Sequence, residues 1–326
     1  MEVRERVTLT MTPLAPGDQL DQYHLEELVA CSGMASIFRA TDTRSGTQVA
    51  VKIPHLQAEC DVVFYDRFQR EAQIGRQLDH PSVIKVMEQK KPSRVYMVME
   101  WVEGRLLRDI LAEAGKFNPP RAVRMALALC DALDYIHSHG VIHRDLKPEN
   151  IMVGCEDQIK LIDFGIAAKA GARRLTFGKL SNIMGTAEYI SPEQVRGRRG
   201  DARSDLYSLG VVLYEMLTGK TPFPGPNPFA VMNARLRGDP VPPRAVNPTL
   251  SSELEAILLR ALARDRENRY ARAADLAHDL EHPDSVRVAD SPAPSAPLST
   301  RVLWYSALAA IPAAIFLLLL YVARIQ

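Results

Sequence analysis

His143-Arg144-Asp145-Leu146-Lys147-Pro148-Glu149-Asn150 is the stretch of this 326-residue chain that decides its fold, and Asp163-Phe164-Gly165 follows it closely. The octapeptide sets a carboxylate at Asp145, an ammonium group at Lys147 and an amide at Asn150 within one short loop. Phosphoryl transfer needs such a cluster, because a carboxylate orients and deprotonates the attacking hydroxyl, a cation lies near the moving charge, and an oxygen ligand holds magnesium. This spacing is unlikely to arise by chance, so it predicts phosphoryl-transfer chemistry.

The octapeptide resembles the catalytic loop of the protein kinase family, His-Arg-Asp-x-x-x-x-Asn, and the resemblance covers about residues 23 to 280. It implies that Asp145 is the catalytic base, that Lys147 contacts the transferred phosphoryl group and that Asn150 is a metal ligand. Asp163 would bind the magnesium ion that bridges the phosphates of ATP. The lysine in the loop is similar to that of the serine/threonine class, so the resemblance implies a bacterial-type serine/threonine kinase with ATP and Mg²⁺ as cofactors.

Val49-Ala50-Val51-Lys52 is an apolar strand pattern that ends in a lysine, which suits a charge presented to phosphates. The resemblance implies that Lys52 binds the α and β phosphates and pairs with a glutamate on a helix. Glu71 is the natural partner, and Glu59 is the weaker alternative. The alternative interpretation, that Glu71 is a surface carboxylate which pairs only with neighbours on its own helix, remains open.

The loop that would cover the phosphates departs from the family's Gly-x-Gly-x-x-Gly-x-Val pattern. Ala30, Ser32 and Ala35 stand at the glycine positions, and only Gly33, off the pattern, remains. A β-carbon limits the backbone and the approach of N–H groups to phosphate, so we expect weakened nucleotide binding. Restoring the three glycines should tighten it. The predicted phosphate-loop residues are Val29, Ala30, Ser32, Gly33, Ala35 and Ile37.

The adenine ring would lie against the link between the lobes. The resemblance implies Met99 as gatekeeper, backbone contacts from Glu100 and Val102, Ala50 above the ring and Met152 below it. Methionine and valine at such positions are also ordinary core residues, and the pattern does not separate the two interpretations.

The segment from Asp163 to Glu193 resembles an activation segment. Thr186 would position the substrate hydroxyl, and Thr176 and Ser181 are candidate phosphorylation sites beside several basic residues. A phosphate there could pair with Arg144 and order the loop, although both residues could equally be plain loop hydroxyls. Two further residues are similar to the family's structural anchors, namely Asp205 and Arg269.

Strand-like runs followed by longer helical patterns predict an α+β fold with two lobes, a small β-rich lobe with one main helix and a larger helical lobe. We expect a helix over Val62 to Leu78 in the small lobe and helices over Pro120 to His139, Asp205 to Thr218 and Ser252 to Ala263 in the large one. The predicted organisation is a tail (1–20), the small lobe (21–102), the large lobe (103–282), a Pro/Ser/Ala-rich linker (283–301), a transmembrane helix (302–322) and a short end (323–326).

Residues 302–322 carry no charge and would span roughly 30 Å as a helix, which matches the hydrocarbon core of a bilayer. A buried helix of the globular part is the alternative. We therefore expect a single-pass membrane protein whose catalytic part lies in the cytoplasm, in contact with lipid through this helix. Forty basic and thirty-nine acidic residues give no reason to expect a nucleic-acid partner. The expected partners are protein substrates that carry serine or threonine, with a homodimer left open.

The altered phosphate loop also allows a hypothesis from a second class of function. A catalytically silent scaffold of the same fold, a pseudokinase, would tolerate the changes at Ala30, Ser32 and Ala35. It would not need the complete set of Lys52, Asp145, Asn150 and Asp163. A kinase of small molecules is disfavoured by the protein-substrate pattern at the end of the activation segment.

Overall fold

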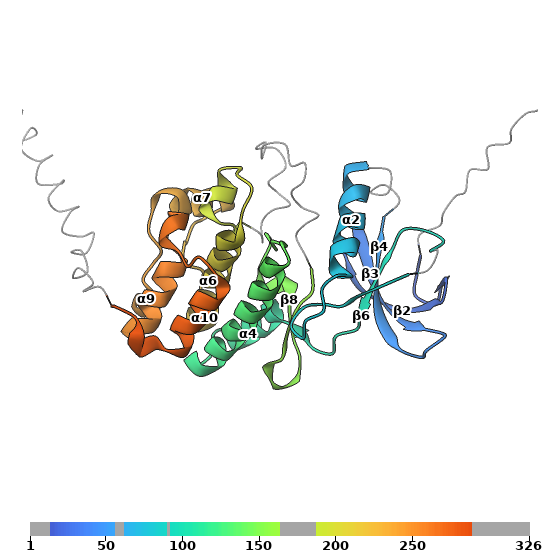
Figure 1. The fold of residues 1–326 in the computed structure, drawn as a ribbon, viewed down its shortest axis with the longest axis horizontal. Helices are drawn as coiled ribbons and strands as arrows, with labels where there is room; N and C mark the ends of the chain where they lie inside the picture. The colour runs from blue at the N-terminus through green and yellow to red at the C-terminus, as the bar shows by residue number, and fades with distance from the viewer. Residues whose placement is uncertain (1–13, 56–61, 90–91, 164–186, 289–326) are drawn as a thin grey trace, which may run out of the picture. The chain divides into compact units, whose positions relative to one another are not determined.

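A computed structural model describes residues 14–55, 62–89, 92–163 and 187–288. Figure 1 shows a small lobe built around an antiparallel sheet and a large lobe built of helices. The predicted two-lobed α+β fold is therefore confirmed for this part of the chain. The predicted transmembrane helix over 302–322 lies outside the described residues, and among the described ones no helix combines the length and apolar character needed to cross a bilayer.

The small lobe contains a six-stranded sheet in the order β1-β2-β3-β4-β6-β5, with every neighbouring pair antiparallel. Two irregularities in the β2–β3 pairing bend β2 as it approaches the predicted phosphate loop. The strands are β1 (Gln19–Leu20), β2 (Tyr23–Cys31), β3 (Ala35–Asp42), β4 (Gln48–Pro54), β5 (Val86–Met87) and β6 (Met97–Glu100).

Helix α2 (Val62–Gly75) is the one described helix of the small lobe, and it ends three residues before the predicted Leu78. Gly75 lies against the sheet, since a β-carbon there would be 2.4 Å from Cγ2 of Val86. Phe68 and Ala72 are each 2% exposed, so one side of α2 packs into the core. This contact fixes the helix beside the strand that carries Lys52.

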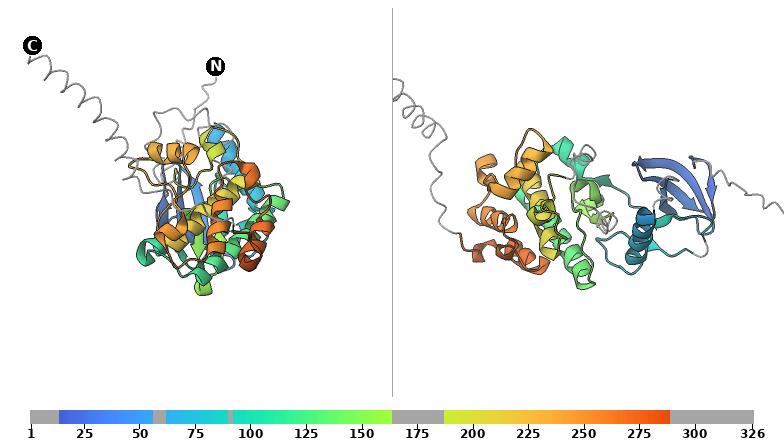
Figure 2. Two further views of the ribbon diagram at one scale, coloured as in Figure 1. Left: turned by 90° about the vertical axis from the view of Figure 1, so that its left-hand side faces the viewer. Right: turned by 90° about the horizontal axis from the view of Figure 1, so that it is seen from above.

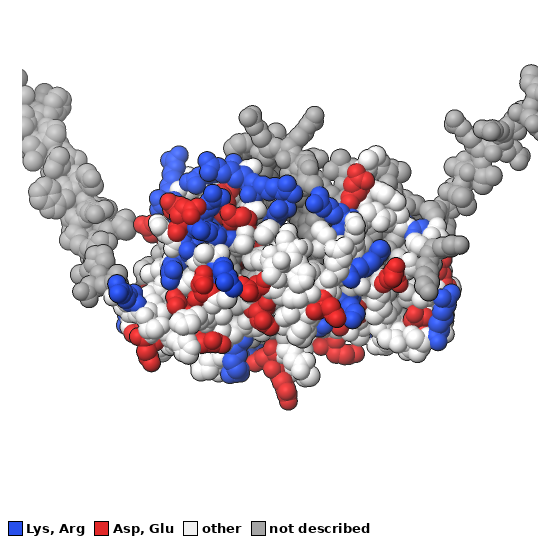
Figure 3. Space-filling view, in the orientation of Figure 1, with Lys and Arg blue, Asp and Glu red and all other residues white. Residues whose placement is uncertain are grey.

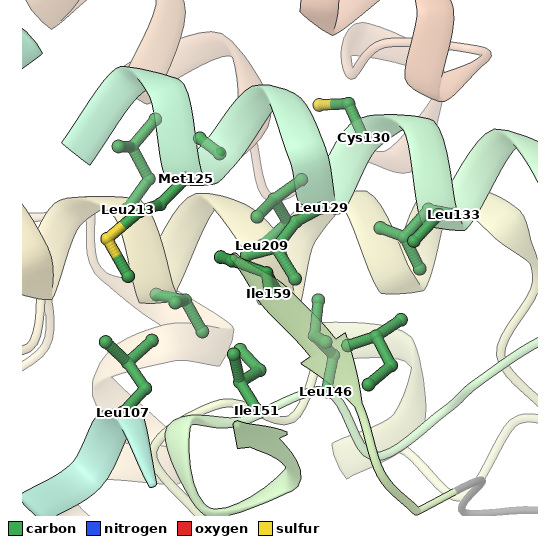
Figure 4. Close-up of a cluster of buried hydrophobic side chains, with 14 of the residues drawn as sticks. Leu107, Met125, Leu129, Cys130, Leu133, Leu146, Ile151, Ile159, Leu209 and Leu213 are labelled. Atoms are coloured by element: carbon green, nitrogen blue, oxygen red, sulfur yellow. The ribbon is translucent and has the colours of Figure 1, made fainter. Parts of the chain in front are cut away.

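The large lobe holds a short sheet, β7-β8-β9, and the helices that follow it. Helix α6 (Ala202–Thr218) is buried along nearly its whole length. In Figure 2 it is surrounded by other helices of the lobe, and Figure 4 shows Leu209 and Leu213 of α6 packed with Met125 and Leu129 of α4. The remaining elements are α3 (Leu107–Ala114), α4 (Pro119–Ser138), β7 (Arg105–Leu106), β8 (Ile151–Val153), β9 (Ile159–Leu161), α5 (Pro192–Val195), α7 (Pro228–Arg237), α8 (Pro243–Val246), α9 (Ser252–Ala261) and α10 (Ala273–Glu281).

The predicted start of α6 at Asp205 is wrong by one turn. Asp201 caps the helix, because its carboxylate accepts a hydrogen bond from the N–H of Arg203 at 3.0 Å and its own N–H donates to Oγ of Ser204 at 3.1 Å. This reciprocal cap starts the helix at Ala202. Asp205 therefore lies inside the helix, where its side chain can reach another loop.

The start of the small lobe and the end of the large lobe differ from the bounds expected from the sequence. The small lobe begins before residue 21, because β1 pairs with β2 and the turn before it is held by a 2.7 Å hydrogen bond from the N–H of Gly17 to the carbonyl of Leu25. Gly17 has a φ of +96°, which favours glycine. At the other end, residues 283–285 form a short 3₁₀ helix and Val286 packs on the core, so the large lobe extends into the predicted linker.

Candidate active site

The octapeptide 143–150 forms the loop between α4 and β8, and a buried carboxylate fixes its backbone. Asp205, fully buried on α6, accepts hydrogen bonds from the N–H of His143 at 2.8 Å and the N–H of Arg144 at 2.7 Å. Its carboxylate also lies 2.8 Å from Nε2 of His137. Arg144 has a φ of +65°, a conformation that costs a non-glycine residue about 1 kcal/mol or more. The bonds to Asp205 hold the loop in this shape.

The predicted catalytic residues lie together in this loop. Nζ of Lys147 is 2.9 Å from Oδ2 of Asp145, and the side-chain amide of Asn150 donates to the backbone carbonyl of Asp145 at 2.7 Å and to its Oδ2 at 3.3 Å. The carboxylate of Asp145 is therefore oriented by two neighbours. Because the amide nitrogen of Asn150 faces Asp145, its amide oxygen is the atom that a metal ion could use.

Lys52 of β4 joins the two lobes. Its ammonium group lies 3.0 Å from Oε1 of Glu71 on α2 and 3.2 Å from Oδ1 of Asp163, which follows β9. Burial opposes the charge on Lys52, but the charges of Asp163 and Glu71 outweigh it and hold the pKa of Lys52 above its ordinary value. Burial, and then the charge of Asp163, raise the pKa of Glu71 to about 8 although Lys52 acts against this. Of the two glutamates considered from the sequence, Glu71 is the one placed against Lys52, while Glu59 lies outside the described residues.

The donors present fit a magnesium ion. The Asp163 side chain is 44% exposed whereas that of Glu71 is only 5% exposed, so Asp163 has an accessible carboxylate oxygen. Magnesium prefers oxygen ligands and is commonly held by one or two protein side chains together with substrate phosphates. No group of three or more His, Cys, Asp or Glu residues in the described part of the chain could hold an ion by itself. Asp163 and Asn150 offer two such oxygen ligands and suit an ion that is also bound by phosphate oxygens.

The turn between β2 and β3 is closed by the hydroxyl group of Ser32. Its Oγ accepts from the N–H of Ala35 at 3.1 Å and from the N–H of Met34 at 3.3 Å, and it donates to the carbonyl of Ala35 at 3.0 Å. The N–H of Ser32 donates to the same carbonyl at 2.9 Å. The serine at a glycine position therefore binds backbone N–H groups of its own loop.

Strand pairing places the predicted adenine residues next to the lysine. Ala50 pairs with Met99 across β4 and β6, and both are buried, at 9% and 6% exposed. The N–H of Glu100 donates to the carbonyl of Lys85 at 2.9 Å, and the Glu100 side chain pairs with Lys160. Since that N–H is already used, Val102, beyond the end of β6, is the better candidate to donate to a base.

Comparison with known proteins agrees with this geometry. The sequence model of the protein kinase domain family matches residues 23–282 of the chain. The chain belongs to the protein kinase family.

Similar proteins of this family are named as bacterial serine/threonine kinases. The serine/threonine-protein kinase PknB of Mycobacterium tuberculosis is 42% identical over 287 residues, which cover 86% of this chain and 45% of the relative. The probable serine/threonine-protein kinase PknB of Corynebacterium glutamicum is 40% identical over 269 residues, which cover 80% of this chain and 42% of the relative. The chain thus spans less than half the length of these relatives.

The fold is similar to that of solved kinase domains. The crystal structure of the M. tuberculosis PknI kinase domain superposes with a TM-score of 0.65 at 24% identity and covers 84% of this chain and all of that one. This likeness supports the two-lobed fold. The activation-segment residues Thr176, Ser181 and Thr186 lie outside the described residues of this kinase.

The sequence interpretation missed a cluster of arginines around the catalytic loop. Burial, and then the positive charges of Arg199 and Arg70, lower the pKa of Arg144. Nε of Arg144 is buried without a hydrogen-bond partner among the described residues. Figure 3 shows basic side chains gathered along the edge of the large lobe that carries α7. Arginines that repel one another next to a catalytic loop indicate a place for an anion.

A second missed feature is the partner of Arg269. Its guanidinium group is completely buried and lies 2.8 Å and 2.9 Å from the two carboxylate oxygens of Glu193. Burial would raise the pKa of Glu193, but hydrogen bonds from Arg269 and Ser204 outweigh it and bring this pKa to about 2. Glu193 is the last residue of the predicted activation segment. The two residues are 76 positions apart, and no local pattern could have paired them.

Proposed function

We propose that this protein kinase transfers the γ-phosphoryl group of ATP to serine and threonine hydroxyls of proteins. The observation that carries the proposal is the pair of contacts from Lys52 to Glu71 and to Asp163, at 3.0 and 3.2 Å, beside a catalytic loop that presents Asp145 and Asn150. A scaffold without catalytic activity would need neither the lysine nor two oriented carboxylates. The similar PknB proteins, named as serine/threonine kinases, support the class of acceptor.

Each residue has a role that follows from its chemistry. Asp145 orients the attacking hydroxyl and accepts its proton, and Lys147, 2.9 Å from that carboxylate, lies ready to offset negative charge on the transferred group. Lys52 binds the α and β phosphates, and Glu71 fixes its position. Asp163 and Asn150 hold Mg²⁺, which when bound supplies positive charge to the phosphate oxygens.

The arginine cluster supports regulation by phosphorylation of the activation segment. A phosphate on Thr176 or Ser181 would offset the repulsion among Arg144, Arg199 and Arg70 through charge-assisted hydrogen bonds. Because the N–H of Arg144 is bonded to Asp205, such a contact would reach the catalytic loop directly. Autophosphorylation would then raise activity.

The uncharged run 302–322 supports anchoring in the membrane, with the kinase lobes in the cytoplasm. Confinement to a membrane raises the local concentration of neighbouring copies and of membrane-bound substrates. This favours phosphorylation of one copy by another and a choice of substrates by location.

The proposal is tested by incubating the full chain and a general protein substrate with labelled ATP and Mg²⁺. The matched variants are Asp145→Asn and Asp163→Asn, which keep the side-chain shape and remove the charge. We expect label on serine or threonine with the unmodified chain and a loss of at least about a thousandfold in both variants. Nucleotide binding without transfer by the unmodified chain would instead identify a scaffold.

A further inference from the structure

Arg235 of helix α7 is an arginine buried inside the large lobe, and only 1% of it is exposed. Among the described residues no carboxylate lies within ion-pair distance of its guanidinium group, whereas Arg269, which is also buried, pairs with Glu193. Burial lowers the pKa of Arg235, so its charge is held in an unfavourable place. A buried charge without a counter-charge is costly unless hydrogen bonds compensate for the lost water.

The guanidinium group of Arg235 donates these hydrogen bonds to the backbone at the end of the predicted activation segment. Nη1 and Nη2 bind three carbonyls, which belong to Ala187, Glu188 and Ile190. The rings of Phe223 and Tyr207 lie beside the guanidinium group, with centroids 5.4 and 5.8 Å from Cζ. The two rings hold the group in place while its N–H donors reach the backbone.

Residues 187–190 depend on side chains for their hydrogen bonds, because they form turns and belong to no helix or strand. Arg235 binds three of their four carbonyls, and the fourth, that of Tyr189, accepts a hydrogen bond from Oγ of Ser208 at 2.8 Å. Four consecutive carbonyls therefore accept from side chains. A guanidinium group suits this arrangement, since its donors are fixed in one plane and can bind several acceptors at once.

This stretch is linked to the catalytic loop. Arg108 donates to the hydroxyl group of Tyr189 and, at 2.8 Å, to Oε1 of Glu149 in the octapeptide. In the sequence, residues 187–190 directly follow Thr186, the residue expected to position the substrate hydroxyl. The shape of this stretch therefore bears on where the acceptor lies relative to the catalytic base.

We propose that Arg235 is a positioning residue of the transfer reaction: it fixes the backbone of residues 187–190, which aligns the acceptor serine or threonine with Asp145. The inference rests on the proposed function, because it concerns the acceptor of that reaction. Arg235 acts only through the backbone that it binds. Its loss should therefore impair transfer to a protein far more than reactions of ATP that use water as the acceptor.

The test compares the full chain with Arg235→Met, which removes the donors at a similar side-chain length, and with Arg235→Lys, which keeps a charge and part of the donors. Transfer from ATP to a general protein substrate and ATP hydrolysis are measured in the same samples with Mg²⁺. We expect kcat/KM for the protein substrate to fall about a hundredfold in Arg235→Met and about tenfold in Arg235→Lys. ATP hydrolysis and the KM for ATP should change less than about twofold.

Two control variants separate positioning from folding. Arg237→Gln removes an exposed arginine of the same helix and should change neither rate. Asn247→Leu removes a buried amide that donates to the carbonyl of Leu217 at 2.8 Å, elsewhere in the large lobe. This variant should lower the Tm as Arg235→Met does, but it should leave kcat/KM for the protein substrate unchanged.

Hydrogen exchange of residues 187–195, followed by mass spectrometry in chains that carry Asp145→Asn, measures the order of the stretch without any transfer. Added Arg235→Met should speed exchange there and leave β4 and α2 unchanged. Equal exchange with and without Arg235→Met would overturn the proposal. An equal loss of transfer and of ATP hydrolysis, or the same loss of transfer in Asn247→Leu, would also overturn it by showing general destabilisation. Absence of transfer by the unmodified chain would instead refute the proposed function.

Discussion

Replacing Ser32 by alanine should tighten ATP binding, which is the reverse of the usual result of altering a nucleotide loop. Backbone N–H groups of such loops bind phosphate oxygens. In this chain the Ser32 hydroxyl already accepts hydrogen bonds from the N–H groups of Met34 and Ala35, at 3.3 and 3.1 Å. ATP must displace these contacts or do without the two donors. The hydroxyl therefore competes with the nucleotide.

The size of the effect follows from the bonds that compete. A net protein hydrogen bond is worth about 0.5–1.5 kcal/mol, and the weaker, 3.3 Å contact contributes at the low end. Release of both N–H groups should make the free energy of ATP binding more favourable by about 1 kcal/mol, which lowers the dissociation constant roughly fivefold. Alanine is a better test than glycine, because glycine adds backbone freedom to the unbound loop, at a cost of about 0.4–1 kcal/mol that offsets part of the gain.

Calorimetry or a fluorescent ATP analogue measures the dissociation constant of the variant and the unmodified chain with Mg²⁺. Ser45→Ala is the matched control, since Ser45 also accepts a turn N–H, that of Thr47 at 3.3 Å, but at the other end of β3. We expect no change in the control. Unchanged affinity in Ser32→Ala would refute the competition, and weaker affinity would show that the serine turn pre-organises the loop instead.

Further predictions concern the large lobe and the C-terminal run. Arg269→Leu should lower the free energy of unfolding by about 3–5 kcal/mol, because it leaves the buried Glu193 carboxylate without a counter-charge and with only the Ser204 hydroxyl as a side-chain donor. Urea unfolding measures this loss, and a value below about 1 kcal/mol would contradict the buried pair. The pKa of Glu193 falls from 4.5 to about 2 on folding, so ionised Glu193 contributes about 3 kcal/mol to the free energy of unfolding. This contribution should be complete above pH 4.5 and lost as the pH falls toward 2. In Arg269→Leu the free energy of unfolding should depend less steeply on pH in this acidic range. Asp205→Ala should abolish transfer and destabilise the lobe, since two loop N–H groups lose their acceptor; full activity would show that the loop does not need it. Deletion of 302–322 should move the chain from the membrane to the soluble fraction, and retention on membranes would count against the anchor.

Much of the fold could be predicted because the patterns are local. The apolar run Val49-Ala50-Val51 predicted the strand β4, and the helix expected from Val62 is α2. The composition of the octapeptide predicted a cluster of Asp145, Lys147 and Asn150, and the structure brings these side chains together. The functional residues of the catalytic loop lie within a few positions of one another, so a single segment of sequence contains all three.

What could not be predicted depends on contacts between distant segments. The start of α6 was misplaced because the apolar pattern begins inside the helix while its cap, Asp201, lies one turn earlier. No local pattern connects Arg199 with Arg144, although in the folded chain the positive charge of Arg199 lies close enough to lower the pKa of Arg144. The sequence identified Ser32 as an unusual residue in the loop, but only the folded turn shows that its hydroxyl binds two backbone N–H groups.

The central claim is that Asp145 and its neighbours transfer phosphate to serine or threonine. The most direct measurement is the mass increase of the full chain during a short incubation with ATP and Mg²⁺, with the modified residues identified by peptide sequencing. We predict an addition of phosphate on serine or threonine by the unmodified chain and none by Asp145→Asn. Equal phosphate in the two chains, or none in either despite bound ATP, would contradict the account.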